Sequence, residues 1–343
     1  MNDKNQLKRE GVLAAGNWIV DHIKVIDTYP DQDALSFIHE HSKSNGGGPY
    51  NLLKDLVNLG AKFPLKAAGL VGDDNDGQWI INDCMDHGID TSGFTQTKNA
   101  STSYTDAMTV KSTGRRTFFH HEGSNALLSE KDVDLSKIKA KYFYLGYLLL
   151  LKSLDEIRES GQTGAKALLA KASAEGYYTI VDLVSAQLGD YKNVVVPSLS
   201  EIDALFLNEF EASALLCFEV KENDVQSLLK AARSILDLGV RDYVILHSSF
   251  GAVAVSSAGE TAVQGSVKLP ENFIKGAAGA GDAFAAGFIL GMNDSESLKS
   301  CLHLGVCSAA SCLSDPTTSG GVMRMEQCLD LGNKYGFRSF EFS

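Results

Sequence analysis

From about residue 140 onward, short apolar segments alternate with amphipathic ones, and this alternation limits the fold more than any other feature. The apolar segments predict strands near residues 142–146, 178–182, 204–207 and 243–247. The amphipathic segments predict helices at residues 152–160, 164–174, 210–216, 224–238 and 282–291. Strands that alternate with helices form a mostly parallel sheet with helices on both faces. The chain is therefore predicted to adopt an α/β fold.

Two segments in the first third of the chain have a different pattern, in which apolar and polar residues alternate. The first covers residues 18–26 and follows a buried strand at residues 11–16. The second covers residues 101–121, and the turn Ser112-Thr113-Gly114 divides it into a hairpin. Strands with one polar face belong to a sheet with one side in solvent. We expect residues 18–44 and 101–123 to form such a sheet, a small lid in which the two segments pair.

Composition excludes several classes of protein. A length of 343 residues suits a single domain, 1–343, that includes the lid. A net charge of −12 argues against a nucleic-acid-binding surface, which is usually basic. The longest apolar run, residues 142–151, is too short to cross a membrane, and the N-terminus lacks the apolar core of a signal peptide. The six cysteines show no metal-ligand spacing and are predicted to be buried free thiols. Together these features predict a cytoplasmic protein.

One short stretch, Gly279-Ala280-Gly281-Asp282, has a pattern that points to chemistry. The small residues leave the backbone of a turn unshielded just before a predicted helix. Free N–H groups and the positive end of the helix dipole bind an anion such as phosphate at such a turn. A carboxylate beside a phosphate is suited to accept the proton of a hydroxyl group that attacks the phosphorus. The alternative is a glycine-rich turn in which the aspartate only caps the helix.

Together with other motifs, this stretch resembles the PfkB (ribokinase-like) family of carbohydrate and nucleoside kinases. Residues 279–284 resemble the core of its C-terminal signature, D-T-x-G-A-G-D-x-F, and residues 46–51 resemble its other signature. Shorter motifs resemble the family at residues 16–21, 69–77, 123–126 and 207–212. Six motifs in the family's order cover the chain from about residue 11 to 335. Such an ordered set is far more specific than any one glycine-rich loop.

The resemblance implies a ribokinase-like fold with a small β-sheet lid, and an ATP-dependent enzyme that uses Mg²⁺ to phosphorylate a sugar or nucleoside. Asp282 would be the general base, and the backbone N–H groups of Gly279, Ala280 and Gly281 would form the anion hole. The acceptor would be bound by Asn17, Asp21, Gly47, Gly48 and Asn51. The nucleotide would contact Asn208, Ser248 and Gly251, and Glu211 would serve the metal. The alternative for Asn208 and Glu211 is a helix N-cap with an acidic first turn.

The chain departs from the family pattern at several positions. Gly276-Ala277 replace the Asp-Thr that begins the C-terminal signature, and this Asp helps to hold a monovalent cation in several members. Residues 246–251 match the family's T-x-G-x-x-G segment only at Gly251, and Leu53 replaces a small residue. Residues 182–185 lack the arginine found in many ketohexose and deoxygluconate kinases. These departures affect the recognition of cation, nucleotide and acceptor more than the transfer itself.

Several functional hypotheses remain open on the sequence. A sugar is the favoured acceptor, and a nucleoside such as adenosine is the alternative. The choice depends on the aromatic residues Tyr104, Phe118 and Phe119, which either stack on a nucleobase or pack the lid against the lid of a second copy. A catalytically inactive sugar- or nucleotide-binding regulatory protein would explain the altered positions 276, 277 and 248. A dinucleotide-binding enzyme is disfavoured, since no loop after the first strand reads G-x-G-x-x-G. The expected partners are a small acceptor, ATP and a second copy bound through the lid, with neither nucleic acid nor membrane.

Overall fold

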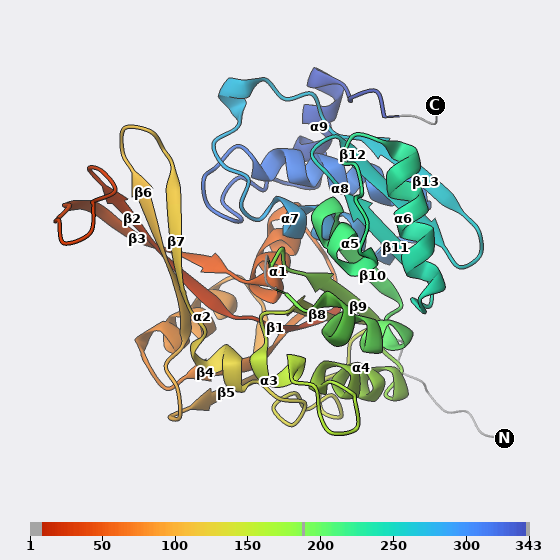
Figure 1. Cartoon of the computed structure of the whole chain (residues 1–343), viewed down its shortest axis with the longest axis horizontal. Coiled ribbons are helices and arrows are strands. Elements are labelled where there is room, and N and C mark those ends of the chain that lie inside the picture. The colour runs from red at the N-terminus through yellow and green to blue at the C-terminus, as the bar shows by residue number, and fades with distance from the viewer. Residues whose placement is uncertain (1–8, 187–188, 341–343) are drawn as a thin grey trace.

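A nine-stranded sheet runs through the centre of the computed structural model, which describes residues 9–186 and 189–340 (Figure 1). Its strand order is β13-β12-β11-β10-β9-β8-β1-β4-β5. The strands are β1 (Val12–Gly16), β4 (Leu65–Gly72), β5 (Asp90–Thr97), β8 (Tyr142–Leu148), β9 (Tyr178–Leu183), β10 (Ala204–Asn208), β11 (Tyr243–His247), β12 (Gly251–Ser256) and β13 (Thr261–Gly265). Neighbours from β5 to β11 pair in parallel, and β12 and β13 add an antiparallel edge. The predicted mostly parallel sheet is confirmed.

Helices cover both faces of this sheet, because its central strands are apolar on both sides. In β1, Val12 and Ala14 belong to one buried cluster, and Leu13 and Ala15 belong to the other. The first cluster packs under α1 (Gly48–Leu59), α2 (Asn75–Asp86), α7 (Ala280–Asn293), α8 (Leu298–Cys312) and α9 (Met325–Tyr335). The second packs under α3 (Lys152–Asp155), α4 (Gly164–Ala174), α5 (Glu209–Leu216) and α6 (Val225–Asp237). Burial on both faces is the usual environment of a parallel sheet.

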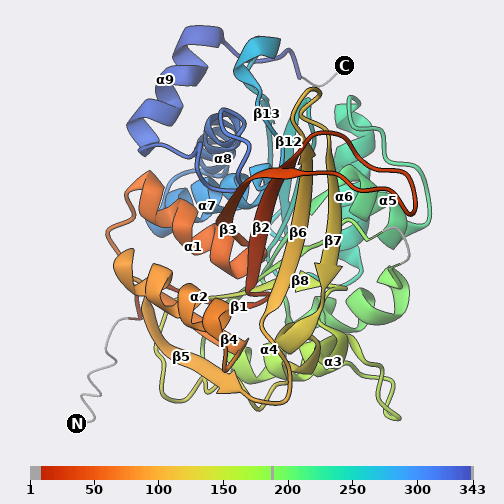
Figure 2. The same ribbon diagram turned by 90° about the vertical axis from the view of Figure 1, so that its left-hand side faces the viewer.

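A second, four-stranded sheet, the predicted lid, projects from one side of the molecule in Figure 1 and is seen face on in Figure 2. It consists of β2 (Ile19–Ile26), β3 (Ile38–Gly46), β6 (Ser103–Val110) and β7 (Arg116–His121) in the order β3-β2-β6-β7. Strand β2 pairs in parallel with β6, so the predicted pairing of the two alternating segments is confirmed. Asp21 lies opposite Thr105 of β6 and Ser44 of β3. The lid therefore presents Asp21 near its junction with the large sheet.

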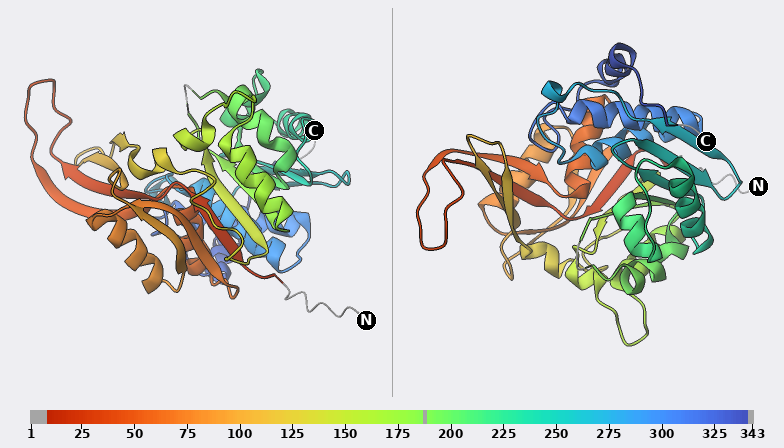
Figure 3. Two further views of the ribbon diagram at one scale, coloured as in Figure 1. Left: turned by 90° about the horizontal axis from the view of Figure 1, so that it is seen from below. Right: turned by 45° about the horizontal axis from the view of Figure 1, so that its top comes forward.

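The lid is fixed at its base and extends freely at its tip (Figure 3). Trp18, just before β2, is fully buried, and its indole N–H donates to the carbonyl of Ala68 at 2.9 Å. Farther along β2, Nε2 of His22 lies 2.9 Å from Oδ2 of Asp76 in α2. These contacts hold the base of β2 against the large sheet and against α2.

Two details of the sequence prediction are wrong. The helix expected at residues 152–160 ends at Asp155, because Glu156 is extended and Ile157 pairs with Thr163 across a turn at Gly161. All six cysteines are free as expected, but Cys217 is exposed rather than buried. Within the described ranges, no helix combines the length and apolar character needed to cross a membrane.

Candidate active site

The glycine-rich stretch forms the start of α7, which begins at Ala280, two residues earlier than predicted. Gly279 precedes the helix with φ 81°, a left-handed conformation that glycine adopts without strain. A Cβ atom added to Gly279 would lie 2.1 Å from the carbonyl oxygen of Thr318. The turn therefore depends on glycine both for its conformation and for its close approach to the loop after α8.

The backbone N–H groups at this helix start are mostly unengaged. Ala280, predicted as a donor of the anion hole, instead donates its N–H to the carbonyl of Ala277 at 3.3 Å. Among residues 9–186 and 189–340, none accepts a hydrogen bond from the N–H groups of Gly279, Gly281 or Asp282. Unpaired N–H groups and the positive end of the helix dipole make this turn suited to an anion. The structure thus favours Asp282 over Ala280 as the third backbone donor.

The side chain of Asp282 points away from its own helix toward α1 and β8. Its Oδ2 atom accepts from Nδ2 of Asn51 at 2.9 Å, and the Tyr147 hydroxyl lies 2.6 and 2.7 Å from Oδ1 and Oδ2. These contacts are to other elements, and no side chain caps the start of α7 with a hydrogen bond among the described residues. The structure therefore does not support the alternative in which Asp282 only caps its own helix. Burial raises the pKa of Asp282 to about 6, although the hydrogen bonds from Tyr147 and Asn51 oppose the rise. A pKa near 6 suits a general base that works at neutral pH.

A chain of amides and hydroxyls holds Asn51 in place. Its Oδ1 atom accepts from Nδ2 of Asn45 at 2.7 Å. The same amide nitrogen of Asn45 lies 3.1 Å from Oγ1 of Thr318 and 2.9 Å from Oγ of Ser319. Asn45 is the next-to-last residue of the lid strand β3, and Thr318 closely approaches Gly279. The position of the lid is thereby connected to the side chain that orients Asp282.

The predicted acceptor residues Asn17, Gly47 and Gly48 also converge on this point. The Asn17 side chain accepts from the N–H of Tyr147 and donates to the carbonyl of Leu150 at 2.9 Å. A Cβ on Gly47 would lie 2.2 Å from the carbonyl oxygen of Asn17, and a Cβ on Gly48 would lie 2.9 Å from Cε1 of Tyr147. The glycines thus allow α1 to start directly against the ends of β1 and β8.

Asp21 lies at the junction of the lid with α1. A Cβ added to Gly46 would lie 2.5 Å from Oδ1 of Asp21, so the carboxyl group packs directly on this glycine. Burial raises the pKa of Asp21 to about 7, opposed by a hydrogen bond from Thr105 and by the positive charge of Arg116. A carboxyl group in this position can accept hydrogen bonds from hydroxyl groups of a ligand below the lid.

Asn208 and Glu211 form a helix cap at the start of α5. Oδ1 of Asn208 accepts from the N–H of Glu211, and Oε2 of Glu211 accepts from the N–H of Asn208, both at 2.9 Å. The hydroxyl of Ser185 donates to Oε1 of Glu211 at 2.8 Å. The capping alternative is therefore confirmed, and it leaves a metal role open, since these oxygens are of the kind that Mg²⁺ prefers. In the part of the chain that the structure describes, no three His, Cys, Asp or Glu side chains form a metal cluster.

Ser248 and Gly251, predicted for the nucleotide, lie just after β11 and at the first residue of β12. The Ser248 hydroxyl donates to the carbonyl of Glu222 at 2.8 Å, and a Cβ on Gly251 would lie 2.5 Å from the carbonyl oxygen of Gln264. Neither contact connects them to Asp282. The preceding residue, His247, does approach the anion loop, because a Cβ on Gly281 would lie 3.4 Å from its Cε1 atom. Burial lowers the pKa of His247 to about 4, so its ring is neutral at pH 7.

Tyr147 and Asp182 are site residues that the sequence analysis missed. Asp182, at the end of β9, accepts from the N–H of Leu183 at 2.9 Å and from the Tyr144 hydroxyl at 3.2 Å. Burial and the nearby charges of Asp282 and Glu211 raise its pKa well above the usual range. An aspartate that ends a buried strand at the carboxyl edge of a parallel sheet was the available signal.

A further buried acid, Asp55 of α1, lies behind the candidate site. It is fully buried, and neither carboxyl oxygen has a hydrogen-bond partner among the described residues. Burial and the charge of Asp282 raise the pKa of Asp55 well above its usual range, and the charge of Lys54 opposes the rise only in part. Asp55 therefore keeps its proton in the folded protein at pH values where the unfolded chain releases it.

We expect the variant Asp55→Asn to gain stability relative to the natural chain as the pH rises above 3.8, the ordinary pKa of the group. The folded state binds the Asp55 proton more tightly than the unfolded state, so rising pH destabilises the natural chain and not the variant. The difference in unfolding free energy should grow by about 1.4 kcal/mol for each pH unit until the raised pKa is reached. Denaturant unfolding between pH 4 and pH 9 measures it. The exposed Asp330 supplies the control variant Asp330→Asn, and a constant difference across this range would contradict the prediction.

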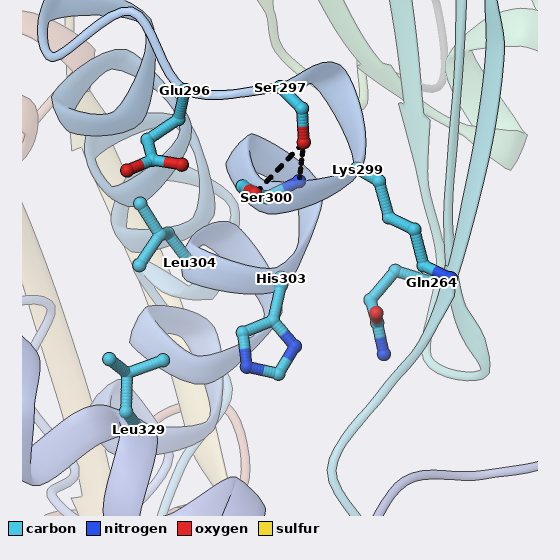
Figure 4. Close-up of a pocket in the computed structure, with 8 residues that line it drawn as sticks. All are labelled: Gln264, Glu296, Ser297, Lys299, Ser300, His303, Leu304 and Leu329. Carbon is cyan, nitrogen blue, oxygen red and sulfur yellow. Dashed lines mark hydrogen bonds between the residues drawn. The ribbon is translucent and has the colours of Figure 1, made fainter.

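Of two surface pockets, the first is remote from Asp282 and the second lies beside the candidate site. The first, of about 490 Å³, opens between β13 and the start of α8, where Gln264, Lys299 and His303 line it (Figure 4). It adjoins the C-terminal end of α7, because Gly291 of that helix contacts Cys301 of α8, and it is therefore remote from Asp282.

The second pocket, of about 760 Å³, adjoins the acceptor side of the candidate site. Leu149 and Leu150 line it, and the carbonyl of Leu150 accepts from Asn17. Glu122 at the end of the lid and Lys152 of α3 are also among its lining residues. A space of this size therefore lies beside Asn17, one of the residues predicted to bind the acceptor.

The sequence matches the family model described as pfkB family carbohydrate kinase over residues 14–323. A 5-dehydro-2-deoxygluconokinase of Geobacillus thermodenitrificans is 25% identical over 309 residues, which cover 87% of this chain and 86% of the relative. An ATP-dependent ribose-1-phosphate kinase of Halopiger xanaduensis is 25% identical over 301 residues, covering 87% of this chain and 90% of the relative.

Solved structures share the whole architecture. A ribokinase of Arabidopsis thaliana, solved in complex with ribose and ATP, has a TM-score of 0.75 at 19% identity and covers 98% of this chain and 100% of its own. Phosphofructokinase-2 of Escherichia coli has a TM-score of 0.76 at 16% identity, covering 95% of this chain and 99% of its own. The fold is therefore ribokinase-like, with the large sheet, its helices and the small second sheet.

Proposed function

The chain belongs to the pfkB family of carbohydrate kinases, and from this premise we propose that it transfers the terminal phosphoryl group of ATP to a hydroxyl group of a sugar. One observation carries the proposal. The buried carboxylate of Asp282 and the unpaired N–H groups of Gly279 and Gly281 lie in the same helix turn. The carboxylate can take up a proton, while the N–H groups stabilise negative charge on a phosphate.

The proposed transfer follows from this arrangement. Asp282 accepts the proton of the sugar hydroxyl as the oxygen forms a bond to the terminal phosphorus. The bond between that phosphorus and the bridging oxygen breaks, and ADP leaves with the electron pair. The N–H groups of Gly279, Gly281 and Asp282 stabilise the charge that spreads over the phosphoryl oxygens. Because Asp282 is almost fully buried, water has little access to compete as the acceptor.

We propose that Asn208 and Glu211 serve Mg²⁺ bound to the nucleotide, and that Ser248 and Gly251 lie on the nucleotide side. The support is the set of oxygen donors that Asn208, Glu211 and Ser185 bring together at the start of α5. When bound, the ion would neutralise charge on the phosphates. Glu211 and Asn208 would orient its water ligands, because their own hydrogen bonds already fix them in the cap.

Removing divalent metal should abolish turnover. We expect EDTA in excess over Mg²⁺ to stop ADP release, and added Mg²⁺ to restore it fully, since the nucleotide phosphates are otherwise uncompensated. The variant Glu211→Gln, which keeps the size of the side chain, should require several-fold more Mg²⁺ for half-maximal rate. Turnover that persists in EDTA, or a Mg²⁺ requirement unchanged in Glu211→Gln, would contradict this part of the proposal.

A sugar is the favoured acceptor, bound by Asn17, Asp21, Gly47, Gly48 and Asn51. The support is that Asn17, Gly47, Gly48 and Asn51 contact the surroundings of Asp282 and that Asp21 lies above them at the base of the lid. A nucleoside is the alternative acceptor. Phe118 and Phe119 of β7 are 58% and 50% exposed, so the lid offers apolar rings that a base could cover.

The test is ADP release with Mg-ATP across pentoses, hexoses, sugar acids, sugar phosphates, inositols and nucleosides. Turnover on one sugar, lost in Asp282→Asn, would support the proposal and give the acceptor class. Turnover confined to nucleosides would replace the sugar by the alternative acceptor. Ligand binding without turnover on any of them would favour the inactive binding protein and overturn the kinase.

A homodimer through the lid is a separate proposal. Its support is that the lid exposes the apolar side chains of Ile38, Phe118 and Phe119. Phe118 and Phe119 face opposite sides of the sheet, so a second lid could cover one of the two sides. Light scattering measures the mass in solution. A monomer at all concentrations, or a dimer that survives the change of Phe118 and Phe119 to serine, would contradict it.

A further inference from the structure

Tyr147 occupies a position that the described chemistry leaves unexplained. It follows the last residue of β8 that pairs with β1, where Gly16 lies opposite Gly146. In a regular strand, Tyr144 and Tyr147 would face opposite sides of the sheet. The register of β8 against β9 shifts between Leu145 and Leu148, and both tyrosines approach Gly48. The irregular end of β8 thus directs a second phenol toward α1 and α7.

Three contacts hold this side chain in place. Its backbone N–H donates to the side chain of Asn17, and its ring packs against Gly48, where a Cβ would lie 2.9 Å from Cε1. Its hydroxyl lies 2.6 and 2.7 Å from the two oxygens of Asp282. The proton of one hydroxyl can serve only one of these oxygens at a time.

Two donors from different elements therefore orient Asp282. The amide of Asn51 in α1 serves Oδ2, which leaves the Tyr147 hydroxyl in β8 to serve Oδ1. A carboxylate oxygen has two acceptor sites, so one site on each oxygen remains for the sugar hydroxyl. With donors at both oxygens, the carboxylate cannot rotate, and the acceptor hydroxyl need not displace Tyr147.

We propose that Tyr147 is a positioning residue for the transfer: its hydroxyl fixes the plane of the Asp282 carboxylate and stabilises the charged form that accepts the proton. This inference rests on the proposed role of Asp282 as the base. Asp182 also has a donor at each carboxyl oxygen, the N–H of Leu183 at 2.9 Å and the Tyr144 hydroxyl at 3.2 Å, but its phenol contact is longer than that of Asp282, and the nearby charges of Asp282 and Glu211 raise its pKa further. The distinct environments explain why Asp282, rather than Asp182, would carry the negative charge in the site.

Other titratable groups surround Asp282, and each could affect its protonation. They are Asp55 of α1, Tyr144 of β8, Asp182 of β9, His247 of β11 and Cys312 of α8. Burial raises the pKa values of the two aspartates, the tyrosine and the cysteine and lowers that of the histidine, so all five favour their neutral forms. The hydrogen bonds from Asn51 and Tyr147 are then the main interactions that stabilise the charged form of Asp282.

The variant Tyr147→Phe tests the inference by removing the hydroxyl and keeping the ring. The ¹³C chemical shift of the Asp282 carboxyl carbon, identified by its loss in Asp282→Asn, gives the pKa without any acceptor. We expect this pKa to rise from about 6 by about one unit or more, because a donor to the charged form is lost. The acid limb of kcat should move to higher pH by the same amount, with KM for the acceptor little changed.

Tyr142→Phe is the matched control, because it removes a phenol hydroxyl from the same strand away from Asp282 and should leave the pKa unchanged. If Tyr147→Phe does not fold, Gly48→Ala displaces the ring and should raise the pKa in the same direction. An unchanged Asp282 pKa, or a loss of kcat equal at every pH, would overturn the role of Tyr147. A lower KM with a higher kcat would also overturn it, because Tyr147 would then obstruct the acceptor. Full activity of Asp282→Asn would instead overturn the proposed function.

Discussion

Replacing Asp282 by asparagine is expected to reduce turnover by at least about 10²-fold, because a positioned general base contributes about that much or more. The amide of the new side chain can keep the contacts to Asn51 and Tyr147, so the fold and the binding of Mg-ATP should survive. Steady-state kinetics and calorimetric titration with Mg-ATP measure the two effects separately. The loss should appear in kcat far more than in the dissociation constant.

The same variant should be more stable than the natural chain above pH 6. The pKa of Asp282 is about 6 in the folded protein, whereas the ordinary value, which applies to the unfolded chain, is 3.8. The folded state therefore binds the Asp282 proton more tightly than the unfolded state. Stability of the natural chain therefore falls as the pH rises from about 4 to about 6 and stays lower above that. Asp282→Asn removes this loss, so at pH 8 its free energy of unfolding should exceed that of the natural chain by roughly 1 to 3 kcal/mol.

Asp294→Asn is the control, since Asp294 is exposed at the other end of α7. It should leave both turnover and the pH dependence of stability unchanged. Unaltered turnover in Asp282→Asn would show that the reaction needs no base at this position. A variant that is inactive but also less stable at pH 8 would show that Asp282 has a structural role instead.

Replacing Gly279 by alanine is expected to damage both the fold and the anion site. Alanine at φ 81° costs about 1 to 2 kcal/mol, and the added Cβ would lie 2.1 Å from the carbonyl oxygen of Thr318. Relief of this clash must move the helix start or the loop, at a further cost of about 1 to 3 kcal/mol. Displaced N–H donors should lower kcat by roughly 10² to 10³-fold. Thermal unfolding and steady-state kinetics with Mg-ATP measure these effects.

Gly281→Ala separates the two effects. Gly281 is helical, and its added Cβ would meet only the His247 ring, at 3.4 Å and beyond. Alanine is the better helix former by about 1 kcal/mol, so this variant should be at least as stable as the natural chain. A methyl group beside the unpaired N–H groups should still hinder the phosphate and lower kcat. Normal turnover and unchanged stability in Gly279→Ala would contradict the role of that turn.

The parts of the fold that the sequence could predict are those with a strong local pattern. The buried strands in the middle of the large sheet are continuous apolar runs, and the lid hairpin alternates regularly around Gly114. The strands β3 and β5 have no strand pattern of their own in the sequence, because their residues are mostly polar, although β3 lies mostly within the predicted lid segment 18–44. No prediction covers the antiparallel edge, β12 and β13, or the helices α8 and α9.

The candidate site shows the same division. Gly279 and Asp282 belong to one short motif and Asn51 to another, and the structure brings the two motifs together across 231 positions of the chain. Tyr147 contacts Asp282 from 135 positions away, through a shift of register that no strand periodicity contains. In the sequence Asp55 is one polar residue in an amphipathic segment, and only packing reveals that its carboxyl group has no hydrogen-bond partner among the described residues.

The main-chain contacts of Gly47 with Asn17 and of Gly279 with Thr318 have a consequence for evolution. At both contacts backbone packs against backbone, so neither glycine can be exchanged without a clash. The lid presents Asp21 and Thr105 on a sheet of its own, and substitutions there leave the core of the large sheet untouched. We therefore expect relatives that act on other acceptors to differ mainly in the lid. Substitutions at Gly47 and Gly279 should be removed by selection.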